Sequence, residues 1–184
     1  MKALITHVFE PFTLPCVMVV RLHQNEGLGE PMVLKLFDRR FATQFRRDAK
    51  TKQWTLESEI QYHKFIKTGG ASELVTDIKE KEFYVKGGGN VAADETYLHY
   101  LMQKSYKTEC KVYNTLKHFQ GKRIPRLLCT LSFPAVPGSA PLSIEKHTTI
   151  PGILMQHIDG FPLSNLSVYV PRTNWQTICD LTFV

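Results

Sequence analysis

Residues 32–37 read Met32-Val33-Leu34-Lys35-Leu36-Phe37, and this stretch decides the fold. It is a short apolar run interrupted by one charge, Lys35, and such runs predict a buried strand. A glycine-containing turn at residues 26–30 joins it to an earlier strand-like run, Cys16–Leu22, and the two runs together predict an antiparallel hairpin. Alternation along the strand places Lys35 on the opposite face from Leu34 and Leu36.

Further patterns on either side of this hairpin predict the rest of the first half of the chain. An apolar run at Leu4–Val8 predicts a first strand, and the turn at Glu10–Pro15 contains two prolines, which cannot join a central ladder. Helical spacing follows at Trp54–Lys67, where Thr55 is a suitable N-cap and Gly69-Gly70 ends the pattern.

The longest helix is predicted at about Asp94–Gln120, where apolar residues recur every three or four positions. Gly121 suits the position after a helix C-terminus, and Pro125 prevents the helix from continuing. These elements predict the α+β class, with an antiparallel sheet of about five strands, the long helix and an inserted helix. The other predicted segments are a loop or weakly ordered insertion at 71–93, strands at Ile124–Leu131 and Ile150–Met155, a loop at Phe133–Leu142, and a final helix starting near Asn174.

The composition is typical of a soluble globular protein with one domain, which we place at residues 1–184. Of the 184 residues 43% are hydrophobic and 22% charged, and no apolar run approaches the ~20 residues that a membrane-spanning helix needs. The first residues do not read as a signal peptide, because His7 and Glu10 interrupt them. Four cysteines without metal-ligand spacing predict reduced, mostly buried thiols in a cytoplasmic or nuclear protein. They are Cys16, Cys110, Cys129 and Cys179.

The positive charge is concentrated in one segment. Between Lys35 and Lys52 there are seven basic and two acidic residues, in a chain whose formal net charge is +6. Such a segment is typical either of a solvated face or of a site for nucleic acid or another polyanion. No zinc-finger, helix-turn-helix or aromatic-interleaved RNA motif accompanies it.

The order of the predicted elements resembles the small N-terminal lobe of a protein kinase. Val33-Leu34-Lys35 occupies the place of the Val-Ala-Ile-Lys strand, and Glu109 lies in a segment that resembles the helix whose glutamate pairs with that lysine. Residues 152–163, Gly-Ile-Leu-Met-Gln-His-Ile-Asp-Gly-Phe-Pro-Leu, are similar to the fifth strand and hinge of aminoglycoside-phosphotransferase-like kinases. Residues 34–41 are similar to the fungal protein-kinase-like proteins.

The resemblance covers most of the chain and implies a lobe without its large partner lobe. Residues 50–93 form an insertion between the third strand and the long helix. Residues 164–184 form the connector and the start of the missing lobe.

The resemblance also implies a nucleotide site. Lys35 holds the ATP phosphates and Glu109 positions the lysine, since a point charge on a rigid strand suits a cluster of phosphate oxygens. The backbone of Gln156, His157 and Ile158 binds the adenine edge, and Leu154 stands near the back of the pocket. Alternatively, Lys35 and Glu109 are ordinary surface residues, and residues 150–160 are a buried strand that leads into a glycine turn.

Other parts of a kinase are missing from the sequence. The turn at Glu10–Pro15 has no glycine, although glycines let backbone N–H groups approach the phosphates. His157-Ile158-Asp159 has the His-x-Asp form, but Ser164 stands where the metal-binding Asn of the family belongs, and no Asp-Phe-Gly follows. We therefore assign no catalytic residue and no metal site, and expect at most weak ATP binding.

Three hypotheses for function follow. The first is a truncated or degenerate kinase-like protein, a pseudokinase-type lobe that binds ATP weakly, is not catalytically competent alone, and has a protein partner covering its exposed face. The second is a basic interaction module that binds nucleic acid or a phosphorylated partner through residues 35–52, with contacts from Arg39, Arg40, Arg46 and Arg47. The third is the ATP-binding part of an active phosphotransferase whose remainder lies outside this chain. None of them involves a membrane.

Overall fold

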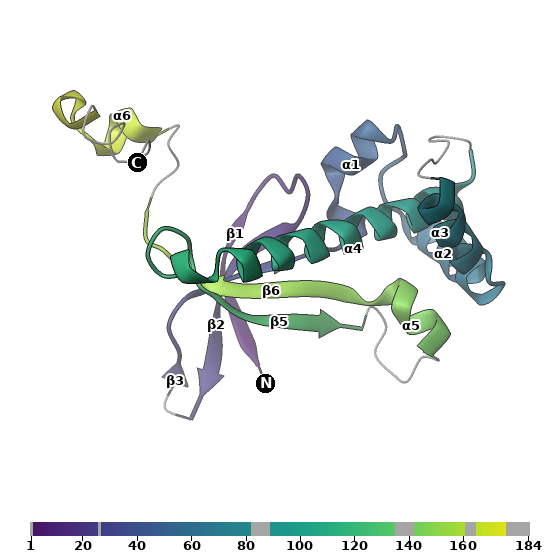
Figure 1. Ribbon diagram of the computed structural model, residues 1–184, viewed down its shortest axis with the longest axis horizontal. Helices are drawn as coiled ribbons and strands as arrows, with labels where there is room; N and C mark the ends of the chain where they lie inside the picture. The colour runs from purple at the N-terminus through teal and green to yellow at the C-terminus, as the bar shows by residue number, and fades with distance from the viewer. Residues whose placement is uncertain (1, 26, 82–88, 135–141, 161–164, 176–184) are drawn as a thin grey trace.

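The computed structural model describes residues 2–25, 27–81, 89–134, 142–160 and 165–175, and its centre is an antiparallel sheet (Figure 1). The strand order is β1-β2-β4-β6-β5, with a two-residue strand, β3, paired to β2. The predicted α+β class and the antiparallel pairing of the second strand with the lysine strand are confirmed. The strands are β1 (Ala3–Phe9), β2 (Cys16–Gln24), β3 (Gly27–Leu28), β4 (Met32–Leu36), β5 (Leu127–Phe133) and β6 (Ile150–Gln156).

One long helix, α4, lies along the sheet beside β6, and most of the shorter helices lie toward its N-terminal end (Figure 1). The contacts of α4 with α2 and α3 build a small helical layer beyond the end of the sheet. The helices are α1 (Thr43–Asp48), α2 (Leu56–Lys67), α3 (Gly70–Lys81), α4 (Val91–Thr115), α5 (Leu142–Thr148) and α6 (Leu166–Tyr169). In the part of the chain that the structure describes, no helix is both long and apolar enough to cross a membrane.

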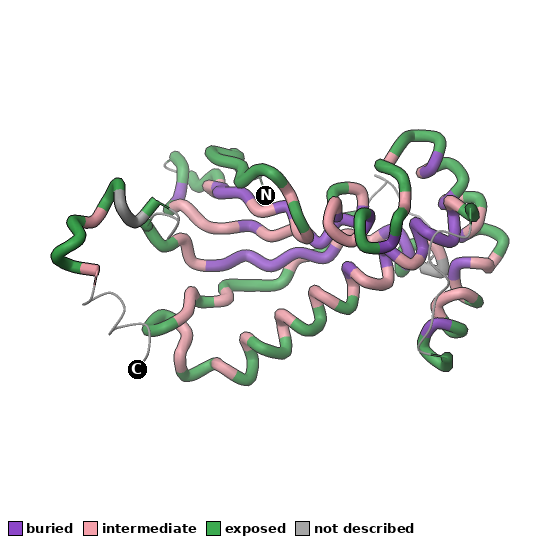
Figure 2. Tube along the Cα trace, turned by 90° about the horizontal axis from the view of Figure 1, so that it is seen from above, coloured by how far each residue is buried: buried purple, intermediate pink, exposed green. Residues whose placement is uncertain are grey.

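The two faces of the sheet bury separate apolar clusters, because successive side chains of a strand point to opposite faces. On the face away from α4, residues of β2, β4 and β6 pack together: Cys16, Met18, Val20, Leu34 and Leu154. On the face under α4, the cluster joins the sheet to that helix: Phe37, Ala42, Met102, Ile153 and Met155. Figure 2 shows buried residues along the central strands and where the helices meet, whereas the C-terminal half of α4 is largely exposed on its outer side.

The inserted helix forms as predicted. α2 begins after Thr55, whose side chain accepts a hydrogen bond from the Ser58 N–H, while the Ser58 hydroxyl oxygen accepts one from the Thr55 N–H. This capping box satisfies two amide groups that would otherwise lack a partner at the helix start. α2 ends at Lys67, and Gly69 has φ +86°, the left-handed conformation that favours glycine after a helix.

The prediction of a loop over residues 71–93 is wrong in its first part, because α3 occupies Gly70–Lys81. The glycine pair ends one helix and starts the next, so that α2 and α3 are joined by a very short turn. Ala71 is fully buried against Tyr62 and Ile66 of α2, and Ile78 is also buried. Burial of one face thus stabilises α3, which local sequence did not indicate. The Gly87-Gly88 segment lies outside the described residues.

Other boundaries also differ from the prediction. α4 starts at Val91, where the Asn90 side chain accepts from the Ala93 N–H, and it ends at Thr115 rather than near Gln120. Gly121 has φ +74° but lies in the following turn. The strand predicted from Ile124 begins at Leu127. α5 was not predicted, and the start of a final helix near Asn174 lies next to residues outside the described part.

The cysteines are less uniformly buried than expected. Cys16 is buried, Cys110 is partly buried and Cys129 is exposed. Cys129 lies on β5, the strand at one edge of the sheet that the described residues form. Cys179 lies outside the described residues.

Candidate functional site

The candidate site centres on an ion pair between the sheet and the long helix. The Lys35 ammonium donates to Glu109 Oε1 at 2.7 Å, across 74 positions of sequence. β4 is hydrogen-bonded to β2 on one side and to β6 on the other, so the lysine stem starts from a backbone that is fixed on both sides. The two side chains are 26% and 24% exposed, and a ligand in solvent can therefore reach the pair.

α4 presents Glu109 to the sheet because this residue lies in register with the apolar stripe of the helix. Residues seven positions apart lie on nearly the same side of an α-helix, and Glu95 and Glu109 are separated by two such steps. Both glutamates therefore lie on the side of α4 that faces the rest of the protein, Glu95 buried and Glu109 partly exposed. The apolar members of the stripe are Leu98, Met102, Tyr106 and Tyr113.

The residues predicted to bind adenine lie at and beyond the end of β6. The Gln156 N–H donates to the Arg126 carbonyl at 2.9 Å, so this donor is already used within the sheet. His157 Nδ1 lies 3.4 Å from Asp159, and the side chain of Ile158 is largely exposed. The backbone amides of His157 and Ile158 make no hydrogen bond to another residue of the described chain, which leaves them available as donors and acceptors.

Leu154 does not share a face with Lys35, which corrects the position predicted for it. Leu154 is paired with Leu34 in the register of β4 and β6, whereas Lys35 is paired with Ile153. Directly opposed residues of antiparallel strands lie on the same face. Leu154 is therefore part of the cluster on the far side of the sheet, and Met155 is the neighbouring residue on the side of Lys35 and α4.

The turn between β1 and β2 is attached to α1. The Thr13 carbonyl accepts a hydrogen bond from the Gln44 N–H at 2.8 Å, and the Thr43 hydroxyl donates to the Phe12 carbonyl. The Phe12 ring also packs edge-on against Phe41. With no glycine and two prolines, this turn has few backbone donors to offer to phosphate groups.

A buried ionic network, which sequence reasoning missed, holds the N-terminal half of α4. Glu95 accepts from Arg46 through both carboxylate oxygens, at 2.8 and 2.9 Å, and from Arg39 at 2.9 Å. Arg39 also donates to Glu59 at 2.7 Å and lies over the Tyr62 ring. The position of Glu95 on the apolar stripe of α4 was the one signal in the sequence, because a carboxylate placed there needs a buried cation.

Burial and neighbouring charges shift the pKa values of Glu59 and Tyr62, which both contact Arg39. Burial opposes ionisation of Glu59, but the Arg39 guanidinium and a hydrogen bond from the Trp54 indole together hold its pKa below the usual value. Burial raises the pKa of the Tyr62 hydroxyl, which donates to the His147 carbonyl. Through the contacts of Arg39 with Glu59 and Glu95, the network ties α2 and α4 to the segment that follows β4.

The same network changes the interpretation of the basic segment at residues 35–52. Arg39 and Arg46 are 6% and 3% exposed and are paired with carboxylates. Arg40 is paired with Asp38. The whole segment is therefore neither a solvated face nor a polyanion site. Of the four arginines predicted to contact a polyanion, only Arg47 is both exposed and without a carboxylate partner among the described residues.

No protein-family model, no curated protein and no solved structure matches this chain. In the described part of the chain no three His, Cys, Asp or Glu side chains come together as a group that could hold a metal ion.

Proposed function

We propose that this chain is a nucleotide-binding lobe of the protein-kinase-like type, which holds ATP weakly through Lys35 and Glu109. The observation that carries this proposal is the 2.7 Å contact between Lys35 on the central strand and Glu109 on α4. The resemblance to kinases predicts this contact, which joins two residues that are 74 positions apart in the sequence. An open antiparallel sheet with one long helix against it also agrees with that resemblance.

The phosphate end of the proposed site depends on the charge of Lys35. A compact ammonium group on a rigid strand attracts phosphate oxygens, and Glu109 limits the conformations of the lysine stem. The pair is partly exposed, so its own contribution to stability is small, roughly 0–1 kcal/mol. Removing the lysine charge should therefore change ligand binding without unfolding the protein.

The adenine end of the proposed site lies toward the end of β6. Val33 lies two residues before Lys35, hence on the same face of β4, and is paired with Met155 on β6. The partly buried Val33 side chain offers an apolar surface for the ring, and the amide groups of His157 and Ile158 offer hydrogen bonds to its edge. This combination of an apolar wall and a few polar groups is common in small-molecule sites.

Two features argue for weak binding without phosphoryl transfer by these residues alone. The turn at Glu10–Pro15 lacks glycine and is attached to α1, so it does not cover phosphates in the manner of a glycine-rich loop. The sequence also has no Asp-Phe-Gly and no His-x-Asp with Asn five residues later. Lys35 and Glu109 can hold a nucleotide, but these two residues do not activate an acceptor.

Calorimetric titration of ATP into the whole chain tests the proposal. We expect Lys35→Ala to weaken ATP binding about tenfold, which corresponds to the loss of one charge-assisted interaction. Glu109→Gln should weaken it less, because the lysine charge remains. Adenosine should compete with ATP, since part of the binding comes from the adenine end.

A matched control is Lys64→Ala, which removes the same charge from an exposed position on α2. It should leave ATP affinity within twofold of the unaltered protein. Equal losses in Lys35→Ala and Lys64→Ala, or no competition by adenosine, would refute the proposed site.

A further inference from the structure

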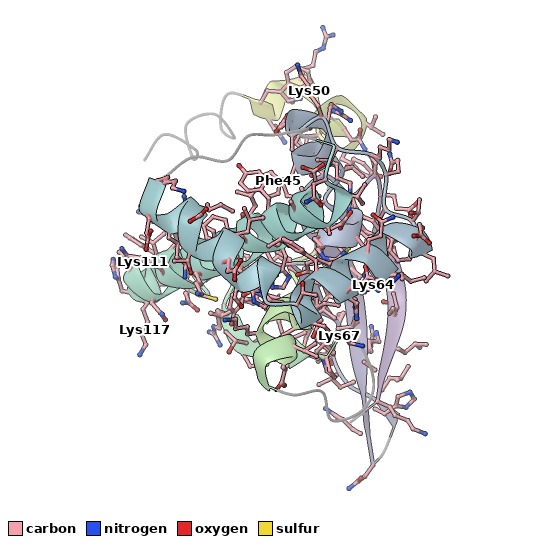
Figure 3. All side chains as sticks on the ribbon, turned by 90° about the vertical axis from the view of Figure 1, so that its right-hand side faces the viewer. Phe45, Lys50, Lys64, Lys67, Lys111 and Lys117 are labelled. Carbon is pink, nitrogen blue, oxygen red and sulfur yellow. The ribbon has the colours of Figure 1, made fainter. Side chains whose placement is uncertain are left out.

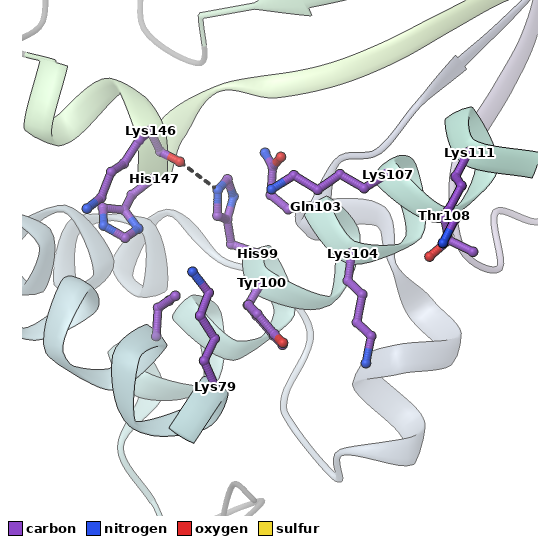
Figure 4. Close-up of a pocket in the computed structure, with 11 residues that line it drawn as sticks. Lys79, His99, Tyr100, Gln103, Lys104, Lys107, Thr108, Lys111, Lys146 and His147 are labelled. Carbon is purple, nitrogen blue, oxygen red and sulfur yellow. Dashed lines mark hydrogen bonds between the residues drawn. The ribbon is translucent and has the colours of Figure 1, made fainter. Parts of the chain in front are cut away.

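A groove lined by basic residues lies on the outer side of α4, where this helix meets α3 and α5 (Figure 4). Its volume is about 520 Å³, within the range of roughly 300–1,000 Å³ of small-molecule sites. Five lysines from three helices line it, and we call it the lysine groove. These are Lys79 of α3, Lys104, Lys107 and Lys111 of α4, and Lys146 of α5.

The lining of the lysine groove contains basic side chains and no carboxylate among the described residues. Glu109 lies between groove residues in the sequence, but helical geometry turns it toward the sheet, where it is paired with Lys35. Five ammonium groups that share one concave surface repel one another, and a bound anion relieves this repulsion.

The shape of the groove indicates an anion with several charges. The lining residues of α4 run from His99 to Lys111, which is about 18 Å along a helix at 1.5 Å per residue. Figure 4 shows Lys79 reaching from α3 toward His99, and Lys107 extending back along α4 toward Gln103. A lysine ammonium binds phosphate as a point charge, so several lysines along one groove can each bind a different phosphate group of the same ligand.

The inner wall of the groove is polar but neutral. Burial, and secondarily the charge of Arg39, lowers the pKa of His99 to about 4, and burial lowers that of His147 to about 4. Both rings are engaged: His99 Nε2 lies 3.2 Å from the Lys146 carbonyl, and His147 Nε2 lies 3.0 Å from the Ser72 hydroxyl. The lysines therefore carry the positive charge of the groove.

We infer that the lysine groove is a second ligand site, separate from Lys35, which binds a small soluble molecule that carries several phosphate groups. Its size favours a small molecule over a nucleic acid. Ligand binding at the groove requires phosphate groups but no nucleobase, in contrast to binding at the site proposed at Lys35.

The test is calorimetric titration of sodium tripolyphosphate, which has phosphate groups but no base, into the whole chain. Lys104→Ala/Lys107→Ala/Lys111→Ala should weaken binding at least tenfold, and alanine is well tolerated at exposed helix positions. The control is Lys64→Ala/Lys67→Ala/Lys122→Ala, which removes the same charge from exposed positions elsewhere. Lys64 and Lys67 are seen on α2 in Figure 3. The control should change the affinity less than twofold.

A second measurement uses the unaltered protein, so it does not depend on whether a variant folds. It follows, by mass spectrometry, how far a ligand protects each lysine from acetylation. Tripolyphosphate should protect Lys104 and Lys107 and leave Lys64 and Lys67 reactive. Absence of protection at the groove, or equal loss of affinity in both triple variants, would overturn the inference. Binding of a 20-nucleotide RNA without any binding of tripolyphosphate would also overturn it, in favour of a nucleic-acid surface.

Lys35→Ala separates this inference from the proposed function. It should leave tripolyphosphate binding unchanged while weakening the adenosine-competed binding of ATP. If Lys35→Ala abolishes tripolyphosphate binding, the phosphates bind at Lys35 and the groove is not a site. If ATP binding proves insensitive to Lys35 while the groove still binds tripolyphosphate, the proposed function fails and the groove stands.

Discussion

Two glutamates of α4 allow a direct comparison of a buried and an exposed ion pair in one helix. Glu95 is 2% exposed and accepts three hydrogen bonds from Arg39 and Arg46. Glu109 accepts one from Lys35, in a pair that is about a quarter exposed. Glu95→Gln and the matched change Glu109→Gln remove the same charge from the buried and from the partly exposed pair.

Glu95→Gln should destabilise the protein by about 3–5 kcal/mol, the usual effect of removing one partner from a buried ionic network. Arg39 keeps Glu59, but Arg46 keeps no carboxylate, and its acceptors are then the backbone carbonyls of Lys52 and Arg39 and the neutral amide oxygen of the new side chain. A buried guanidinium without a carboxylate is therefore left in the interior. Glu109→Gln should cost about 0–1 kcal/mol, because water solvates the lysine that remains.

Urea unfolding followed by circular dichroism measures both effects, since the midpoint and slope give the free energy of unfolding. A loss of several kcal/mol is a large part of the 5–15 kcal/mol of a typical domain, so Glu95→Gln could be partly unfolded without urea. For this reason Glu95→Leu/Arg46→Met is included, which removes the unpaired charge and should recover much of the loss. Equal, small effects of Glu95→Gln and Glu109→Gln would refute the reasoning that burial determines the cost.

Two further predictions concern pH and thiol chemistry. Folding lowers the pKa of His99 and His147 from 6.5 to about 4, so between these values the unfolded chain binds more protons and stability must fall as the pH drops. The almost fully buried His99 alone should lower the free energy of unfolding by roughly 3 kcal/mol by pH 4. Urea unfolding at pH 7 and pH 4.5 should show a smaller loss of stability in His99→Gln than in the unaltered protein. A urea midpoint of the unaltered protein that does not change with pH would contradict this prediction. Burial, and secondarily the Asp38 carboxylate, raises the pKa of Cys16 to about 12, whereas Cys129 is exposed. At pH 8 a thiol reagent should label Cys129 in the native protein and Cys16 only after denaturation, and rapid native labelling of Cys16 would show that the first sheet cluster opens readily.

Features that depend on local pattern were predictable from the sequence. Short apolar runs bounded by turns identified β2, β4 and β6, and Thr55 with the glycine pair identified both ends of α2. The periodicity of α4 identified the long helix, although its ends were misplaced by a few residues. Pairing of Lys35 with Glu109 was predictable only by resemblance, since nothing local connects two residues 74 positions apart.

The tertiary structure alone decided what depends on partners distant in the sequence. α3 is helical because Ala71 packs on α2, and the lysine groove exists because three helices converge on one surface. A run of basic residues has the same local pattern whether it faces solvent or carboxylates. Only the register of α4, which carries Glu95 to Arg39 and Arg46, turns part of that run into a buried network. The physical reason is that periodicity specifies which side chains share a face, whereas packing specifies what that face meets.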